Sequence, residues 1–297
     1  MKKKTVLTVG NFDGVHRGHQ KLIQEAIRIS IRESITPKVV VLEPHSKEFL
    51  KEKMSEISRI TKFKDKAILI KSFGIKDIIR LNFNKNLAMT DENKFIKEVL
   101  VKRFKMKHLV IGCDFRFGKN KKGNAISVKD MGEKYDFKVT VVNPILFENK
   151  KISSSEIRAL IRNNDFERNK KLLGHSLCIS GYVHYGQRRG REIGFPTANI
   201  KIHKNLVFSG VYMTRTIIDG EVYYGISNIG SRPTFNGKYR LLENHIFLFS
   251  GDLYGKFINI EIVKFIREER KFFNLNELNH QIKKDKKKAN YWIQHST

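Results

Sequence analysis

Cysteine is scarce in this 297-residue sequence, which contains only two, Cys113 and Cys178. They lie far apart, and neither belongs to a CxxC pair or to the spacing of a metal-binding motif. The sequence therefore indicates neither a disulfide framework nor a zinc site. Such sparse use of cysteine fits a reducing compartment.

Long hydrophobic runs are also missing. No window approaches the roughly 18 uninterrupted apolar residues of a membrane-spanning helix. The chain begins with the cationic stretch 1–4, but the apolar stretch 6–9 that follows is shorter than the core of a signal peptide, which needs about 7 to 15 residues. We interpret it as a first strand, and we expect a cytoplasmic protein with no membrane partner.

Acidic residues are few: 30 Asp and Glu stand against 58 Lys and Arg, for a formal net charge of +28. Such an excess points toward polyanionic partners such as nucleic acid. The alternative is that lysines are scattered over solvated faces without a dedicated partner. We favour this alternative because the lysines form no single block interleaved with aromatic residues. We therefore expect no specific nucleic-acid partner.

The length favours two domains. The first half of the chain has the sequence pattern of an α/β domain. Short runs rich in Val and Ile alternate with segments of helical periodicity, which is the pattern of a parallel sheet covered by helices. The clearest helices are 20–32 and 91–103, the second with Phe95, Val99 and Leu100 on one side. The predicted strands are 5–9, 38–42, 78–81, 108–111 and 138–142.

After about residue 173 the pattern changes to that of an antiparallel β domain, a closed barrel or a sandwich. Asp219-Gly220 lies between two β-rich runs and suits a two-residue type I′ hairpin turn, in which both residues need positive φ. The stretch 275–293 predicts a closing amphipathic helix whose lysines mostly lie outside its apolar stripe. We place the two domains at 1–174 and 175–297. The predicted strands of the second domain lie within 182–183, 211–218, 222–226, 245–249 and 258–265.

A glycine-rich loop with two histidines follows the first predicted strand and opens a helix, which is where α/β sheets bind ligands. Gly14 and Gly18 allow close approach of the backbone, the helix start offers free N–H groups, and His16 and His19 can donate to phosphate oxygens. A histidine at such a place is often only a cap. Two that flank one glycine favour an anion site, and fixed donors there stabilise charge that develops during attack on a phosphate.

A serine-rich segment at the far end of the same domain has two interpretations. Ser153 and Glu156 fit the S-x-x-E capping box, which stabilises a helix start without any ligand. Three consecutive hydroxyls followed by Arg158 also suit a second phosphate cradle with charge-assisted hydrogen bonds. Beside the first loop, we favour the functional interpretation. The hydroxyls are those of Ser153, Ser154 and Ser155.

These two motifs, GNFDGVHRGH over 10–19 and SSSEIR over 153–158, resemble the nucleotidylyltransferase superfamily in the branch of bacterial FAD synthetases. The segments 43–45, 59–61 and 112–118 are similar to that branch as well. The resemblance implies that His16 and His19 contact ATP phosphates and that Ser154 and Arg158 hold the distal ones. It assigns the rest of the phosphate loop to Gly10, Asn11, Phe12, Asp13, Gly14 and Gly18, and a border of the flavin pocket to Asp114, Phe115 and Arg116.

The β domain carries a second candidate site in a stretch rich in glycine and arginine, 181–199. Taken alone, this stretch is typical of a basic turn. Thr197 and Asn199, however, alternate along an extended segment, so both could present oxygen atoms to Mg²⁺ from one face. Further along, Glu243 offers a carboxylate of the kind that a phosphoryl transfer to an alcohol needs. A single glutamate without such a context is usually a solvent-exposed residue with no catalytic role.

Five segments of this half closely resemble riboflavin kinase: 190–199, 229–235, Glu243, 252–255 and the tail 267–272. The resemblance implies that Thr197 and Asn199 bind the Mg²⁺–nucleotide and that Glu243 activates the ribityl 5′-hydroxyl. It also implies nucleotide contacts at Gly186, Gly190, Arg191 and Gly194, and flavin contacts at Arg232, Arg267 and Glu269.

Together the two halves resemble the family of bifunctional riboflavin kinase/FAD synthetases. This implies that the β domain phosphorylates riboflavin with ATP to FMN, and that the α/β domain transfers AMP from ATP to FMN, giving FAD and pyrophosphate, both with Mg²⁺. Departures from the family pattern are modest, among them Ser46 where Pro is usual and Ser155 where Thr is usual. The rival hypotheses are a nucleotidylyltransferase for another acceptor and a basic nucleic-acid-binding protein.

Overall fold

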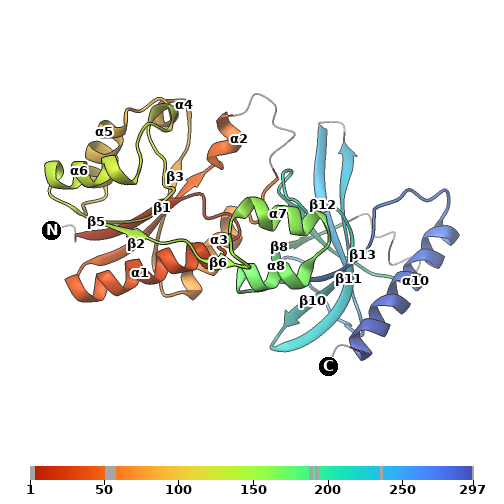
Figure 1. Cartoon of the computed structure of the whole chain (residues 1–297). Coiled ribbons are helices and arrows are strands. Elements are labelled where there is room, and N and C mark those ends of the chain that lie inside the picture. Colours follow the sequence, from red (N-terminus) through yellow and green to blue (C-terminus); the bar gives the residue numbers. More distant parts are fainter. Residues whose placement is uncertain (1–3, 51–57, 187–189, 191–193, 235–236, 296–297) are drawn as a thin grey trace. The chain divides into compact units, whose positions relative to one another are not determined.

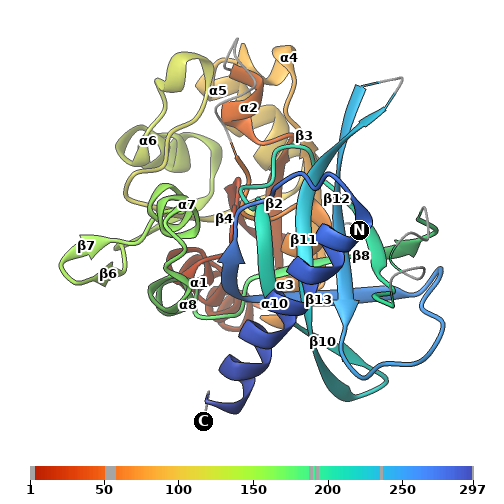
Figure 2. The ribbon, with the colours of Figure 1, turned by 90° about the vertical axis from the view of Figure 1, so that its right-hand side faces the viewer.

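The chain divides into two compact units in a computed structural model (Figures 1 and 2). The structure describes residues 4–50, 58–186, 190, 194–234 and 237–295, and the side chains of all of these except 49–50 and 231–239. The α/β unit comprises Met1–Ser58 and Lys66–Ile157, and the barrel unit comprises Arg59–Asp65 and Arg158–Thr297. The sequence-based boundary after residue 174 stays a prediction.

A five-stranded sheet with the strand order β3-β2-β1-β4-β5 forms the centre of the α/β unit, and all of its neighbouring strands are parallel. Its strands read as continuous β-branched runs because both faces are covered; Val39, Val40 and Val41 of β2, for example, are all fully buried. The predicted parallel sheet is confirmed. The strands are β1 Thr5–Gly10, β2 Thr36–Glu43, β3 Asp77–Asn82, β4 Met106–Gly112 and β5 Lys138–Val142.

Helices cover both faces of this sheet. On one face Val6 of β1 packs with Ala26 and Ile29 of α1, and on the other Leu7 and Val9 pack with the apolar side chains of η2 and α6. Side chains alternate along β1 between these two cores, as the two-residue period of a strand requires. The remaining elements of this part of the chain are α1 Arg17–Glu33, α2 Ser46–Leu50, α3 Phe63–Ser72, α4 Lys85–Ala88, α5 Glu92–Lys94, η2 Phe95–Arg103, η3 Lys119–Lys121, α6 Ala125–Tyr135, β6 Leu146–Phe147, β7 Lys150–Lys151, α7 Ser154–Arg162 and α8 Phe166–Leu173.

The predicted helix at 91–103 differs from expectation. Asp91 caps a short α5, and the chain then continues as the π-helix η2. Because a π-helix bonds residue i to residue i+5, Phe95 and Leu100 lie on the same side, and both are buried together with Ile96. Ile96, which the expected stripe left out, is thus part of the buried side.

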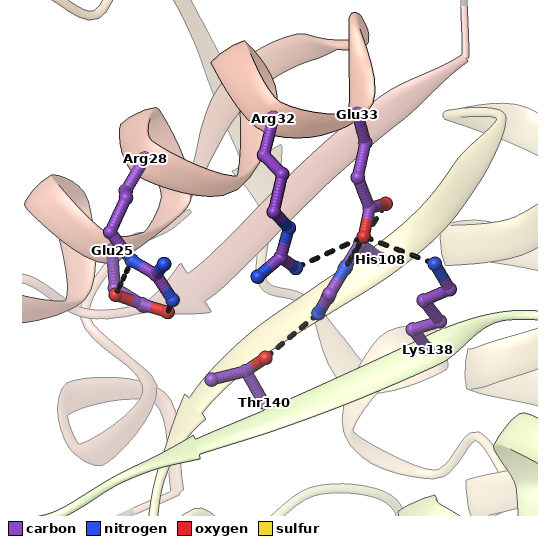
Figure 3. A network of polar contacts seen from close by, with 7 residues as sticks. All are labelled: Glu25, Arg28, Arg32, Glu33, His108, Lys138 and Thr140. Carbon is purple, nitrogen blue, oxygen red and sulfur yellow. Dashed lines mark hydrogen bonds and ion pairs between the residues drawn. The ribbon is translucent and has the colours of Figure 1, made fainter.

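A network of charged side chains fixes the C-terminal end of α1 to the sheet (Figure 3). Glu33 accepts hydrogen bonds from Lys138 Nζ at 3.2 Å and lies 3.3 Å from His108 Nδ1. The other nitrogen of that imidazole, Nε2, lies 2.8 Å from Thr140 Oγ1. The network thus joins α1 to β4 and β5, and the opposite end of the same helix carries His16 and His19.

A closed barrel with the strand order β10-β11-β12-β9-β8-β13 forms the barrel unit. All of its pairings are antiparallel, so the barrel prediction is confirmed and the sandwich alternative is wrong. The β10–β11 hairpin turns at Asp219 and Gly220, with φ 52 and 89, as the type I′ turn requires. The strands are β8 Cys178–His184, β9 Ala198–Ile202, β10 Gly210–Ile218, β11 Glu221–Thr234, β12 Gly237–Ile246 and β13 Phe257–Arg267.

A segment from the first half of the chain completes the barrel unit. The amide of Arg59 donates to Asn205 O at 2.5 Å, and Val207 donates back to Arg59 O at 2.8 Å. Six residues on, the carboxylate of Asp65 accepts hydrogen bonds from the amide and hydroxyl of Ser180 on β8. Arg59 itself is buried. The barrel unit is therefore built from two separate stretches of sequence, although all strands of the barrel itself come from the second.

The predicted C-terminal helix is confirmed as α10 Leu275–Gln294. Figure 2 shows it running beside the barrel strands, and its contacts are with β11 and β13. Ala289 is buried in one apolar cluster with Val211 and Met213 of β10, so the helix also covers part of that strand. Two of its lysines are also engaged: Lys288 donates to the carbonyl of Ile266 and Lys286 lies over an aromatic ring. Within the described residues, no helix has the length and apolarity needed to cross a bilayer.

Candidate active sites

The loop between β1 and α1 has an unusual backbone. Phe12 and Val15 have φ 48 and 41, and Gly14 has φ 82. Positive φ at two large non-glycine residues is strained, and it persists only where the surroundings over-determine it. Here Phe12 and Val15 are both fully buried, so packing holds the loop in place. The loop lies at the carboxyl end of β1, beside β4, where the strand order of the sheet reverses.

The two histidines of this loop form a stacked pair. Their ring centroids are 3.7 Å apart and their planes differ by 22°, and the His19 amide donates to His16 Nδ1 at 3.4 Å. A Cβ at Gly18 would lie 3.1 Å from His16 Cε1, so glycine leaves room for this ring. His16 is therefore the N-cap of α1, as the structural alternative held, and it also lies against His19 at the mouth of the predicted phosphate site.

The pKa of His19 lies well below its usual value. Burial is the largest cause, followed by the nearby charges of His16, Lys66 and Lys151. The ring is therefore neutral at pH 7 and has one N–H to donate. Its Nδ1 is buried and has no hydrogen-bond partner in the part of the chain that the structure describes. A polar atom in that state indicates a site shaped for a ligand.

The serine-rich segment forms the predicted helix cap, and its role as a phosphate cradle stays a prediction. Ser153 Oγ accepts from the amide of Glu156 at 3.2 Å, as a helix cap should. Its neighbour Ser154 donates from Oγ to Asp13 O at 2.9 Å, which ties the start of α7 to the phosphate loop. Ser155 is exposed and Arg158, one turn further along α7, is buried. The two motifs therefore meet through Ser154 and Asp13.

Lys66 of α3 is a residue that the sequence reasoning missed. Its side chain is fully buried, and Nζ donates to Asn11 O at 2.9 Å and lies 3.9 Å from Glu43 Oε2. Asn11, predicted to bind phosphate, uses its side-chain amide instead in two hydrogen bonds with Ser46, of 2.9 and 3.0 Å. Since 62–71 contains several lysines, no sequence signal distinguishes the one that becomes buried.

The predicted flavin segment after β4 is held by a second lysine that was not foreseen. Lys151 of β7 forms an ion pair with Asp114. Burial acts to raise the pKa of Asp114, but the hydrogen bond and charge of Lys151 outweigh it and lower that pKa. Phe115 stacks on the buried Phe117, with centroids 5.2 Å apart, while Arg116 is exposed. The Arg116 guanidinium turns back and donates to the Phe115 carbonyl at 3.2 Å.

In the barrel, strand register aligns a row of polar residues. His184 of β8 pairs with Asn199 of β9, Asn199 pairs with Glu243 of β12, and Glu243 pairs with Asn228 of β11. Directly opposed residues of antiparallel strands lie on the same face. The predicted Asn199 and Glu243 are therefore neighbours, although 43 positions separate them. Asn228 extends the row and was not predicted.

Close backbone approach surrounds Asn199. Its Nδ2 donates to Thr197 O at 3.3 Å, and a Cβ at Gly186 would lie 2.5 Å from that nitrogen. A Cβ at Gly190 would lie 2.3 Å from the carbonyl oxygen of Phe195. Gly194, with φ 77, has open space around it. Arg191 lies outside the described residues, and so does the side chain of Arg232, whose backbone pairs with residue 239 in the β11–β12 hairpin.

The two remaining predicted flavin residues have different surroundings. The Arg267 guanidinium bonds both carboxylate oxygens of Asp285 on α10, at 3.1 and 3.0 Å from Nε. Glu269 instead approaches the polar row, with Oε1 3.5 Å from Asn228 Nδ2. A Cβ at Gly230 would lie 1.9 Å from the same oxygen, so that glycine makes room for it. Glu269 thus lies beside the row, whereas Arg267 anchors α10.

An α/β unit with a histidine pair at a strand-to-helix junction, joined to a barrel with a carboxylate and an amide in register, defines a transferase with two phosphate-handling sites. The family model of FAD synthetase matches residues 1–156 and that of riboflavin kinase matches 173–293. The chain belongs to the bifunctional riboflavin kinase/FMN adenylyltransferase family. This confirms the resemblance inferred from the motifs, including the order of the two halves.

Individual relatives support this over nearly the whole chain. The bifunctional enzyme of Buchnera aphidicola subsp. Schizaphis graminum is 39% identical over 290 residues, covering 96% of this chain and 93% of the relative. That of Bacillus subtilis is 38% identical over 293 residues, covering 96% and 92%. A crystal structure from Streptococcus pneumoniae, described as a macrolide-efflux protein, has a TM-score of 0.78 at 29% identity and covers 98% of this chain and 95% of its own.

Proposed function

We propose that each unit carries out one ATP-dependent reaction, and that the two reactions run in the reverse of the chain order. The barrel unit phosphorylates riboflavin to FMN, and the α/β unit transfers AMP to FMN to give FAD and pyrophosphate. The observation that carries this proposal is the presence of two separate groups of side chains suited to ATP phosphates. One is the stacked pair of His16 and His19, and the other is the register pair of Asn199 and Glu243.

In the α/β unit, an oxygen of the FMN phosphate attacks the α-phosphorus of ATP, and the bond from that phosphorus to the β-bridging oxygen breaks. Negative charge then builds on the equatorial oxygens and on the leaving pyrophosphate. The remaining free N–H groups at the start of α1 and the imidazoles of His16 and His19 would donate to such charge, and donors that are already fixed lose no energy to reorganisation. We assign the distal phosphates to Ser154 and Arg158.

In the barrel unit, the ribityl 5′-hydroxyl attacks the γ-phosphorus of ATP and ADP leaves. Glu243 accepts the hydroxyl proton, which is the role of a positioned base in phosphoryl transfer to an alcohol. Asn199, opposite Glu243 in the register, orients the phosphates. We assign flavin contact to Glu269, whose Oε1 lies 3.5 Å from Asn228 Nδ2 and so beside the polar row.

Thr197 and Asn199 fit Mg²⁺, which prefers oxygen ligands and usually keeps substrate phosphates among them. They would supply a hydroxyl and an amide oxygen. The carboxylate of Glu243, opposite Asn199 in the register, is then left to accept the proton. No group of three or more His, Cys, Asp or Glu in the described residues is placed to hold a metal alone. When bound with ATP, Mg²⁺ would neutralise charge on the β- and γ-phosphates.

Two variants of the full chain test the division of labour. Purified protein is supplied with MgATP and either riboflavin or FMN, and FMN and FAD are separated and quantified. We expect His19→Ala to abolish FAD formation from FMN while riboflavin phosphorylation continues, and Glu243→Gln to do the reverse. The retained activity in each variant controls for folding. Loss of both activities in either variant would contradict the two-site assignment.

A further inference from the structure

We propose that Lys66 is a positioning residue for AMP transfer: its ammonium group holds the Asn11 carbonyl, which fixes the phosphate loop and brings a positive charge into contact with it. The proposal rests on the assignment of that loop to the phosphates of ATP. It adds a residue from α3 to a site otherwise built from the β1–α1 loop and the start of α7.

Burial is the first observation. Lys66 is one of the largest fully buried side chains in the described chain. Taking an ammonium group out of water costs several kcal/mol unless it is well compensated. Its compensation here is polar and local: Nζ donates to Asn11 O at 2.9 Å and lies 3.9 Å from the buried carboxylate of Glu43. A charge in that setting is held at one point in space, in contact with the loop.

Loop geometry is the second observation. Asn11 is bonded through its side chain to Ser46 in both directions and through its carbonyl to Lys66. The strained part of the loop begins at the very next residue, Phe12, with φ 48. A peptide fixed from two sides immediately before a strained turn sets the direction in which the following N–H groups point. Release of the Asn11 carbonyl would therefore loosen the donors intended for phosphate.

The charge itself is the third observation. The charged and titratable groups around His19 come from three elements: His16 at the cap of α1, Lys66 on α3 and Lys151 on β7. Burial lowers the pKa of His19 most, and these charges lower it further. Lys66 thus favours the neutral imidazole and at the same time raises the positive potential where phosphates would sit.

The test compares Lys66→Met, which keeps the stem without the charge, with Lys66→Gln, which keeps a donor without the charge. Steady-state kinetics of FAD formation from FMN are measured beside riboflavin phosphorylation in the same preparation. We expect Lys66→Met to lower kcat/KM for FAD formation about 10- to 100-fold, the worth of a hydrogen bond to a charged group. Riboflavin phosphorylation should stay within about twofold. Lys71→Met, an exposed change on the same helix, is the matched control.

A pH profile separates positioning from simple packing. Removal of a positive charge makes His19 easier to protonate, so its pKa rises in both Lys66 variants. The acid limb of kcat/KM for FAD formation should then move to higher pH in both, and stay in place in Lys71→Met. Lys66→Gln should keep more of its kcat than Lys66→Met because its amide can still donate to Asn11 O.

Each other outcome is decisive. If Lys66→Met forms FAD at the wild-type rate with an unshifted pH profile, while His19→Ala is inactive, the Lys66 proposal fails and the assignment of the loop stands. Retained FAD formation in His19→Ala overturns the assignment of the loop itself. Loss of both activities in Lys66→Met and Lys66→Gln alike would make Lys66 a folding residue. Full activity and an unshifted profile in Lys66→Gln would overturn the role of the charge and leave only the hydrogen bond to Asn11 O.

Discussion

Asn199 and Glu243 face each other across β9 and β12, so that an amide and a carboxylate lie side by side on one face of the barrel. Asn228 continues this row on the far side of Glu243. The alignment depends on strand register, and a slip by one residue would turn each side chain to the opposite face. The proposed kinase site therefore depends on the pairing of these strands.

Gly186 is expected to be essential for riboflavin phosphorylation. In Gly186→Ala the new Cβ would lie 2.5 Å from Asn199 Nδ2, closer than packed atoms can approach, so the amide must move out of the row. Overpacking of this kind costs about 1–3 kcal/mol. We expect kcat/KM for MgATP in riboflavin phosphorylation to fall about 10-fold or more, whereas FAD formation from added FMN should not change. An equal loss in both assays would contradict this explanation.

Asn244 should stabilise the strand that carries Glu243. Its Oδ1 accepts from Thr214 and Ser227, both at 2.9 Å, and its Nδ2 donates to Thr216 at 3.2 Å, with all four residues buried. Asn244→Leu would leave buried hydroxyls without their partner, at a cost of about 1–3 kcal/mol for an unsatisfied group. We expect a lower unfolding midpoint in urea, with partial recovery in the variant that also carries Thr214→Val and Ser227→Ala. Lack of recovery would point instead to overpacking by the larger leucine.

Local patterns predicted the elements of the fold but not every residue of the sites. Two features could be predicted from the sequence because each depends only on neighbouring residues. They are the buried strand with Val39 and Val40 and the turn at Asp219-Gly220. The burial of Lys66 depends on where α3 packs, and its sequence context offers only more lysines. The π-helical turns of 95–103 likewise could not be predicted from local pattern, because these residues pack against side chains of the sheet.

Arg267 illustrates a further limit. Motif resemblance assigned it to flavin, yet its guanidinium is bound to the buried Asp285 on α10. The resemblance identifies a position and cannot identify the partner, because that partner lies in a helix whose packing is not local. Asp285 itself lies within the expected apolar stripe of that helix, where it forms this ion pair. Whether Arg267 also contacts flavin stays a prediction.

A double-mutant cycle separates the two roles of Arg267. Breaking a buried pair by removing one partner costs about 3–5 kcal/mol, and the partly buried setting of Arg267 places it toward the lower end. We expect Arg267→Met and Asp285→Asn each to lower the free energy of unfolding and to be strongly non-additive, as measured in urea. If Arg267 also binds flavin, KM for riboflavin should be higher in Arg267→Met than in Asp285→Asn. Equal KM values in the two variants would confine Arg267 to anchoring.

Acid should loosen the end of α1 through Glu33 and His108 (Figure 3). Burial acts to raise the pKa of Glu33, but hydrogen bonds from His108, Lys138 and Arg32 outweigh it and lower that pKa from 4.5 to about 2. A carboxyl whose pKa is depressed by folding contributes stability above its unfolded pKa, and that stability is lost as pH falls from about 4.5 toward 2. Burial also lowers the pKa of His108, against the effect of Glu33, so protonation of the unfolded chain already opposes folding below about pH 6.5.

The variant Glu33→Gln isolates the carboxylate in this network. The shift of Glu33 corresponds to about 3 kcal/mol at most, by the conversion of 1.36 kcal/mol for each pKa unit. We expect the free energy of unfolding of Glu33→Gln to be lower than that of the wild type at pH 7, and the difference to shrink as pH approaches 2. Glu98→Gln, which removes an exposed ion pair with Lys102, should differ little at any pH. A difference between wild type and Glu33→Gln that stays constant from pH 7 to pH 2 would show that the stability lost is that of packing and not of charge.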